Sequence, residues 1–330
     1  MKAVIVRRHG ALEALALEER PTPEPGPQQV LVDVHAAGVN FPDLMVIAGT
    51  YQTLPQLPFT PGKEFAGVVS RVGEGVTTLK RGDRVTALIG HGAFAEQIVL
   101  DETTAHAIPS EMSFPEAAAL NLTYLTAHFA LVERAQLKPG EIVLVTGAAG
   151  GVGLAAVQIA KALGATVLAA VSTPEKAAAA KASGADQIID GSVPGLRNGL
   201  RDQVFAVTDK HGADVIVDQV GGDVFDASLR AAAWEGRIVL IGFASGRIPE
   251  IKAGYILVKN IGVMGLHIGD YRDRQPEKFR QARQQLFDWY RAGKIKPHVM
   301  AAYPLQDYLS ALNVVKNRQA IGKVVLTTAG

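Results

Sequence analysis

The sequence EIVLVTGAAGGVG, residues 141–153, decides the fold of this chain. Glu141–Thr146 is a continuous apolar run typical of a buried strand, Gly147–Gly153 is a glycine-rich turn, and Leu154–Leu163 is a predicted helix. Glycines in such a turn permit positive φ angles and a close ligand, and the helix N-terminus offers unpaired N–H groups to a phosphate. This arrangement predicts a dinucleotide site, the alternative being a tight connection without a ligand. The predicted phosphate-binding residues are Gly150, Gly151, Val152 and Gly153.

Strands and helices continue to alternate after this turn. Short runs rich in Val, Ile and Ala recur at the spacing of strand–helix–strand units, which predicts an α/β fold with a doubly wound parallel sheet covered on both faces. The predicted strands are Thr166–Val171, Gln187–Ile189, Asp214–Val217, Arg237–Ile241 and Ile261–Leu266, and the predicted helices run from Pro174 to Ser183 and from Asp223 to Trp234.

The N-terminal part of the chain has the pattern of a small β-rich unit. Its short predicted strands are separated by turn-forming clusters such as PTPEPGP at residues 21–27. Near the C-terminus, Pro276–Arg291 has helical periodicity and Lys323–Thr327 is a predicted strand, and we expect this segment to fold back onto the first unit. The predicted N-terminal strands are Lys2–Val6, Val30–Ala36, Phe65–Val72 and Arg84–Leu88.

Composition excludes several classes of function. The chain has 330 residues, 48% of them hydrophobic, and 33 basic against 32 acidic side chains give a net charge of +1. A near-neutral chain without a basic run is atypical of a nucleic-acid binder, so we expect a small-molecule partner and no nucleic acid. The absence of cysteine excludes disulfides, thiolate nucleophiles and cysteine-bound metals. The short apolar run before Arg7 predicts neither a signal peptide nor a membrane span, and we expect a cytoplasmic protein.

The end of the second predicted strand indicates which dinucleotide is bound. An NAD site usually places a carboxylate about 20 residues beyond the glycine turn to bind the ribose 2′-hydroxyl. Here Val171 is followed by Ser172 and Thr173, with Lys176 one turn later. Hydroxyl donors and an ammonium suit a 2′-phosphate, and the sequence therefore predicts NADPH. Glu175 is a carboxylate in this segment and would favour NAD instead, but a Glu in the first turn of a helix is typically a partner of the helix dipole.

Several further stretches, in order along nearly the whole chain, carry a resemblance to a known family. The sequence resembles the medium-chain dehydrogenase/reductase superfamily, in its zinc-free, zeta-crystallin-like NADPH:quinone oxidoreductase branch. The resemblance implies a GroES-like β-rich catalytic domain of residues 1–121 and 268–330, and a Rossmann NADPH-binding domain of residues 122–267. The stretches are AGVNFPD (37–43), PGKEFAG (61–67), RGDRV (81–85), GAFAE (92–96), AAGGVGLAAVQIAKALGA (148–165) and IGKVV (321–325).

The chain departs from zinc-dependent members of the superfamily. It has Asn40 and Lys63 where those proteins carry a catalytic cysteine and a histidine, and we expect no metal site. Alcohol oxidation without a Lewis acid lacks its usual means of stabilising an alkoxide, whereas a conjugated acceptor needs less help. Lys63 itself is either a solvated side chain or a cation that favours an anionic acceptor.

The resemblance also implies roles for individual residues. Asn40, Asp43 and Tyr51 are the implied catalytic residues, although Asn40 and Asp43 would also suit a helix cap and Tyr51 a plain pocket wall. Thr126 and Phe129 match positions near the nicotinamide, with ordinary packing as the alternative. Other implied cofactor residues are Asn40, Gly242, Phe243, Ala244, Ser245 and Arg318. The family often forms homodimers through the edge of the Rossmann sheet, and Ala253–Leu266 is apolar enough to do so here.

Together these features predict a zinc-independent, NADPH-dependent reductase that transfers hydride from nicotinamide C4 to a quinone or another α,β-unsaturated carbonyl, in EC class 1.6.5 or 1.3.1. One alternative is a reductase of enoyl thioesters or acrylate-type acids, for which Lys63 would bind an anion. The other is a protein that binds NADPH without catalysis.

Overall fold

The computed structural model describes residues 1–328 and divides into two compact units. Unit 1 comprises Met1–Leu122 and the segment from Pro297 onward, and unit 2 comprises Thr123–Lys296. The first boundary lies beside the expected one at residue 121, but the second lies at 296/297 instead of 267/268. Residues 268–296 stay with unit 2 because the rings of Tyr271 and Phe279 pack on Phe129, with centroids 4.6 and 5.9 Å away.

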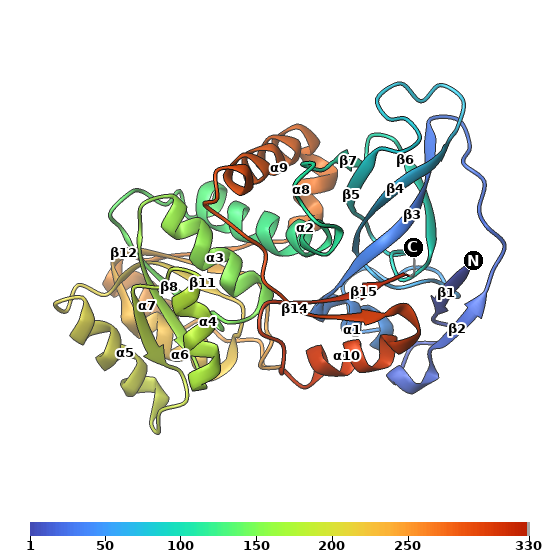
Figure 1. The fold of residues 1–330 in the computed structure, drawn as a ribbon. Coiled ribbons are helices and arrows are strands. Elements are labelled where there is room, and N and C mark those ends of the chain that lie inside the picture. The colour runs from blue at the N-terminus through green and yellow to red at the C-terminus, as the bar shows by residue number, and fades with distance from the viewer. Residues whose placement is uncertain (329–330) are drawn as a thin grey trace. The chain divides into compact units, whose positions relative to one another are not determined.

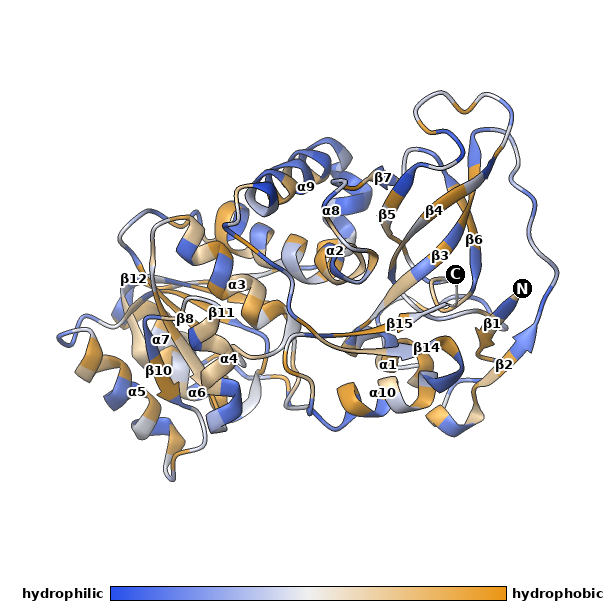
Figure 2. Cartoon of the chain, viewed as in Figure 1, coloured by the Kyte–Doolittle hydropathy of each residue, from blue (hydrophilic) through white to orange (hydrophobic). Residues whose placement is uncertain are grey.

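Unit 2 contains a six-stranded sheet in the order β10-β9-β8-β11-β12-β13, in which every neighbouring pair is parallel (Figure 1). This confirms the predicted doubly wound α/β architecture. The central strands β8, β9 and β11 are buried on both sides, as their apolar sequences require, and most strands are drawn in the hydrophobic colours of Figure 2. The strands are β8 (Ile142–Thr146), β9 (Thr166–Val171), β10 (Gln187–Asp190), β11 (Ala213–Asp218), β12 (Ala232–Leu240) and β13 (Gly262–Gly265).

Helices connect these strands. α3 contacts β8 and β9 through a face of Ala, Val, Leu and Ile, and α5 presents alternating apolar and polar segments (Figure 2). The helices are a π-helical turn η2 (Phe129–Arg134), α3 (Gly151–Ala162), α4 (Pro174–Ala182), α5 (Leu196–Val207), α6 (Gly222–Ala231), α7 (Ala253–Lys259), α8 (Ile268–Arg274) and α9 (Pro276–Arg291); α2 (Phe114–His128) spans the boundary between the units. Within residues 1–328, no helix is both long enough and apolar enough to cross a membrane.

Unit 1 is the predicted β-rich unit. Its main sheet has the order β14-β15-β3-β4-β5-β7, with β6 paired to β3, and β1 pairs with β2 in a small separate sheet. The strands are β1 (Lys2–Ile5), β2 (Ala16–Glu19), β3 (Gln29–Val39), β4 (Glu64–Val72), β5 (Arg84–Leu88), β6 (Gln97–Asp101), β7 (His106–Ala107), β14 (Val299–Pro304) and β15 (Lys323–Thr327). The helices are α1 (Phe41–Ala48), α10 (Tyr308–Lys316) and the short η1 (Leu12–Ala14) and η3 (Leu305–Asp307).

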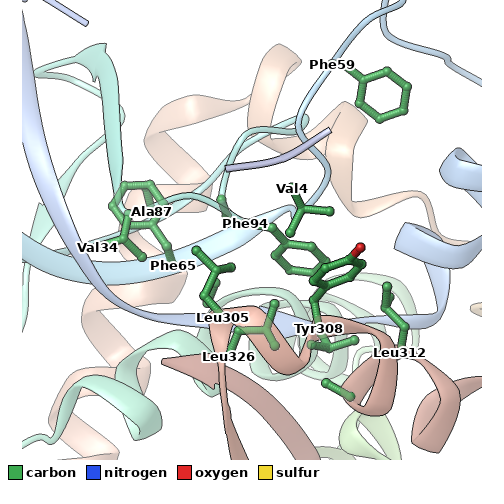
Figure 3. Close-up of a cluster of buried hydrophobic side chains, with 14 of the residues drawn as sticks. Val4, Val34, Phe59, Phe65, Ala87, Phe94, Leu305, Tyr308, Leu312 and Leu326 are labelled. Atoms are coloured by element: carbon green, nitrogen blue, oxygen red, sulfur yellow. The ribbon is translucent and has the colours of Figure 1, made fainter. Parts of the chain in front are cut away.

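The segment from Pro297 onward folds back onto unit 1, as expected, whereas α9, which was expected to go with it, belongs to unit 2. β15 pairs antiparallel with β3, matching Val324 with Val39 and Thr327 with Ala36. Figure 3 shows Leu305, Tyr308 and Leu326 of this segment in one apolar cluster with Val4 and Phe94 from the N-terminal part. This packing closes the core of unit 1 with residues from both ends of the chain.

One predicted helix is too long. The helix expected over Asp223–Trp234 ends at Ala231, and Ala232 instead pairs with Ala213 as the first residue of β12. The alanines fit either structure, so the pairing with the neighbouring strand decides the boundary.

Candidate functional site

The glycine turn after β8 has the conformation that its sequence predicts. Gly147 has a φ of 58°, and Gly150 is the N-cap of α3. A Cβ on Gly153 would lie 2.4 Å from the Gly147 carbonyl oxygen, so helix and turn can pack this closely only with glycine there. The turn therefore forms a cradle of half-buried backbone at a helix N-terminus, which is the geometry that binds a pyrophosphate.

Two residues that the sequence analysis missed hold this turn in place. Gln219 Nε2 donates to the carbonyls of Thr146 and Gly147, at 2.6 and 3.0 Å. Asp218 is fully buried and accepts from Thr146 Oγ1 at 2.6 Å, and burial raises the pKa of its carboxyl. Asp218 and Gln219 directly follow the apolar residues Val215–Val217, and this could have indicated their position from the sequence, because parallel strands end at the same edge of a sheet.

The residues predicted to bind the 2′-phosphate follow directly after β9. Thr173 is the N-cap of α4, and its hydroxyl accepts from the Lys176 backbone N–H at 3.3 Å. Ser172 and Thr173 are exposed, and Lys176 is half-buried. The Glu175 pKa is lowered, first by a backbone N–H and then by the Thr173 hydroxyl, which supports the interpretation of Glu175 as a helix-terminus partner.

The loop after β12 is joined to the loop after β11. The backbone N–H groups of Ala244 and Ser245 donate to the carbonyls of Gln219 and Val220, at 3.1 and 2.8 Å. The predicted segment from Gly242 to Ser245 thus lies at the same sheet edge as the glycine turn. Residues from the ends of β8, β11 and β12 are brought together here.

The two predicted nicotinamide neighbours on the α2–η2 segment are both buried. Thr126 has an exposed fraction of 4%. Phe129 is fully buried between the rings of Tyr271 and Phe279. Phe129 therefore supports the segment from inside the core of unit 2 and offers no surface to a ligand.

Unit 1 contains a buried polar network at one end of its main sheet. Lys323 Nζ donates to Glu64 Oε1 at 2.7 Å, to Asn40 Oδ1 at 2.6 Å and to the Val39 carbonyl at 3.1 Å. Asn40 Nδ2 donates to Glu64 Oε1 at 2.9 Å. Asn40, Glu64 and Lys323 are 5%, 0% and 4% exposed, so this charge pair is almost completely desolvated and needs each of these bonds.

The network requires particular neighbours. A Cβ on Gly38 would lie 2.3 Å from Glu64 Oε1, so glycine at this position makes room for the carboxylate. The Leu122 backbone N–H donates to the other carboxylate oxygen at 2.6 Å. The sequence analysis named Asn40 but missed Glu64 and Lys323, which are 259 positions apart.

Asp43 lies beside this network at the start of α1. Its Oδ2 accepts from the Asn40 backbone N–H at 2.8 Å, so both residues do serve as a helix cap. Burial raises the pKa of Asp43 to about 7, against the lowering influence of Lys63, the Asn40 N–H and Lys323. Asp43 is thus a buried carboxyl that exchanges its proton near neutral pH.

Tyr51 and Lys63 form a second part of the same region. The Lys63 ammonium lies 4.6 Å above the centre of the Tyr51 ring and donates to the Gly90 carbonyl at 3.1 Å. Partial burial, followed by the positive charge of Lys63, lowers the pKa of His91. Lys63 is half-buried and contacts both the Tyr51 ring and the Gly90 carbonyl, and its role remains a prediction.

Arg318 is exposed in the turn after α10, in unit 1, and its role toward a cofactor remains a prediction. Among residues 1–328 there is no group of three or more His, Cys, Asp or Glu side chains that could hold a metal ion.

A parallel sheet with a glycine-rich turn at a helix N-terminus, in one chain with a β-rich unit, is the organisation of two-unit dehydrogenases and reductases. Sequence comparisons agree with this class. The alcohol dehydrogenase GroES-like domain family matches residues 26–110, and the zinc-binding dehydrogenase family matches residues 151–288.

Individual relatives narrow the family. The chain is 42% identical to the quinone oxidoreductase-like protein 2 homolog of Nematostella vectensis, over 92% of this chain and 82% of that protein. The structure of Escherichia coli quinone oxidoreductase complexed with NADPH superposes with a TM-score of 0.91 at 32% identity, covering 99% of this chain and 100% of that one. CurK enoyl reductase superposes with a TM-score of 0.89 at 28% identity, covering 99% of each chain. The chain belongs to the medium-chain dehydrogenase/reductase superfamily, in its quinone oxidoreductase branch.

Proposed function

We propose that this protein is a zinc-independent, NADPH-dependent reductase of quinones or other α,β-unsaturated carbonyls. The observation that carries the proposal is the glycine cradle at the N-terminus of α3, where the lack of a Cβ on Gly153 lets turn and helix pack closely. When bound, NADPH supplies a hydride from nicotinamide C4. The reaction class corresponds to EC 1.6.5 or 1.3.1.

The cradle fits the pyrophosphate of a dinucleotide. Gly151, Val152 and Gly153 would present backbone N–H groups to it, and Gly150, whose own N–H donates to the Gly147 carbonyl, would leave room for it because it has no Cβ. Gln219 would keep the turn in shape. Ser172, Thr173 and Lys176 would bind the 2′-phosphate, with Arg318 as a further cation. Gly242, Phe243, Ala244, Ser245 and Thr126 would lie beside the nicotinamide.

The polar residues of unit 1 would serve the acceptor. Asn40 would orient the acceptor or the nicotinamide ribose, and Tyr51 would contact the acceptor oxygen. Asp43, with a pKa of about 7, would hold a proton and deliver it after hydride transfer, through Tyr51 or water. Zinc independence is supported by the Glu64–Lys323 ion pair, since Lys323 already neutralises the buried carboxylate.

Steady-state assays test the proposal. NADPH oxidation is expected with at least one benzoquinone, naphthoquinone or enone, and it should survive dialysis against a chelator. No turnover with any acceptor, or activity that returns only when zinc is added, would contradict it.

A second candidate is an enoyl-thioester reductase, favoured by the structural similarity to CurK enoyl reductase. Preference for crotonyl-CoA over quinones and simple enones by kcat/KM would select it. Tight NADPH binding without any reduction would instead indicate a non-catalytic binding protein.

We further propose a cytoplasmic homodimer. β13 is an edge strand of the unit 2 sheet, and the neighbouring α7 exposes Leu257 and Val258, each 78% accessible. An open edge beside exposed apolar side chains is a surface that a second copy could cover.

A further inference from the structure

Strand pairing brings together the three side chains of the buried network in unit 1. The register of β15 on β3, continued by one residue, places Lys323 opposite Asn40. The register of β4 on β3, continued in the same way, places Glu64 opposite Gly38. The backbones of three neighbouring strands therefore fix the positions of Asn40, Glu64 and Lys323 relative to one another.

The N–H protons of Lys323 and Asn40 are all committed to acceptors inside the protein. The Lys323 ammonium has three protons. It donates to the Val39 carbonyl, Asn40 Oδ1 and Glu64 Oε1, at 3.1, 2.6 and 2.7 Å. The Asn40 amide has two protons, and it donates to the Gly38 carbonyl at 3.1 Å and to Glu64 Oε1 at 2.9 Å. With these bonds formed, neither side chain can donate a hydrogen bond to a ligand.

The same bonds hold the Asn40 amide in one orientation. Turning the amide over would place its NH₂ group against the Lys323 ammonium and its oxygen against the Glu64 carboxylate. Because Glu64 is 0% and Lys323 4% exposed, water does not relieve these unfavourable contacts. The Asp43 backbone N–H donates to the main-chain carbonyl of Asn40 at 3.1 Å. Asn40 Oδ1 thus retains one lone pair, and Asn40 can accept a further hydrogen bond but cannot donate one.

We propose that Lys323 and Glu64 are positioning residues that fix Asn40 as a hydrogen-bond acceptor, so that Asn40 recognises a hydroxyl group of a ligand and not a carbonyl oxygen. The inference rests on the proposed function, in which Asn40 orients either the nicotinamide ribose or the acceptor. A carbonyl oxygen has no proton to donate to Asn40, whereas a ribose hydroxyl and a hydroxyl on the acceptor each have one. Separate experiments distinguish these two sources of the hydroxyl.

Binding of the cofactor tests the ribose as the source. Fluorescence titration compares NADPH with analogues that lack the 2′- or the 3′-hydroxyl of the nicotinamide ribose. The loss of one hydrogen bond should weaken the binding of one analogue to the wild type by about 10-fold. Asn40→Ala should bind that analogue and NADPH equally, because the acceptor of the hydrogen bond is gone.

Steady-state kinetics test the acceptor as the source. The measurement compares kcat/KM for 1,4-naphthoquinone and for its 5-hydroxy derivative. A hydroxyl bound by Asn40 should raise the ratio of the two values in the wild type by about 10-fold relative to the ratio in Asn40→Ala. The comparison of ratios removes the difference in intrinsic reactivity between the two quinones.

Variants of Lys323 distinguish positioning from a merely structural role. In Lys323→Met the amide of Asn40 is free to turn, so the 10-fold discrimination should fall toward equality. A structural residue would change both affinities by the same factor and leave their ratio unchanged. The double variant Glu64→Gln, Lys323→Met gives the same readout without leaving an unpaired buried charge. Lys323→Arg should restore part of the ratio, and Lys316→Met, exposed at the end of α10, should match the wild type.

The outcomes separate this inference from the proposed function. A wild type that distinguishes neither pair of ligands, or an Asn40→Ala variant that still distinguishes them, overturns the recognition of a hydroxyl by Asn40. A ratio that is unchanged in Lys323→Met and in the double variant overturns the positioning role. A wild type that binds NADPH but reduces no acceptor contradicts the proposed function, and the cofactor titration still decides the role of Asn40. A wild type that binds no NADPH contradicts both.

Discussion

Asp43 is the residue whose environment makes the most specific prediction. Its pKa is raised by burial from 3.8 to about 7, so the folded protein retains a proton that the unfolded chain has already lost. The sign follows from linkage: this group costs no stability below about pH 4, costs more as pH rises, and reaches its full cost above about pH 7.

Asp43→Asn should therefore remove a pH-dependent loss of stability, because the amide resembles the protonated carboxyl. From pH 5 to pH 8 the wild type should lose about 2–3 kcal/mol more than the variant. Thermal unfolding at both pH values measures this, with exposed Asp307→Asn as the control. Equal pH dependence in wild type and Asp43→Asn would show that Asp43 titrates normally.

Lys176 is the residue to which the proposed function assigns the preference for NADPH over NADH. Lys176→Ala should weaken NADPH binding by about 10–100-fold, the value of a charge-assisted hydrogen bond, and leave NADH binding nearly unchanged. Fluorescence titration with both coenzymes measures this, and exposed Lys252→Ala is the matched control. An equal loss of affinity for NADPH and for NADH would show that Lys176 does not bind the 2′-phosphate.

At the scale of elements, the turn between β8 and α3 offers a matched pair of glycines. A Cβ at Gly153 would meet backbone at 2.4 Å, whereas one at Gly150 would lie 3.5 Å from its nearest neighbour, the Gly147 carbonyl oxygen. Gly153→Ala should lower stability without any ligand, by about 1–3 kcal/mol. Gly150→Ala should fold normally and lose affinity for NADPH, because its methyl would occupy ligand space. Thermal unfolding of both variants with and without NADPH measures these effects. Equal changes in stability and in NADPH affinity for both variants would contradict the binding of NADPH at this turn.

The helices and strands also differ in how well the sequence could predict them. The glycine turn, β9 and α9 were predictable because their signals are local: a glycine cluster, an apolar run and a helical period. The short helices α7 and α8 bury no residue and have no such period. The Glu64–Lys323 pair was missed because it depends on β15 pairing with β3, across most of the chain. Local sequence patterns do not indicate which distant strands will pair.

At the scale of the whole molecule, the open edge at β13 predicts a dimer. Leu257→Asp with Val258→Asp should yield a monomer with its fold intact, because two carboxylates cannot be buried unpaired. Sedimentation velocity measures the mass, and Val72→Asp, exposed at the end of β4, is the control. A double variant with unchanged mass would place any interface elsewhere.

The central claim is that a nicotinamide cofactor bound at the glycine cradle gives its hydride directly to a conjugated acceptor. The most direct test uses NADPH deuterated at C4, in each stereochemical form, with an enone whose β-carbon does not exchange with water. Mass spectrometry of the product should find one deuterium on the β-carbon from one of the two forms. A reduced product without deuterium from either form would contradict direct transfer.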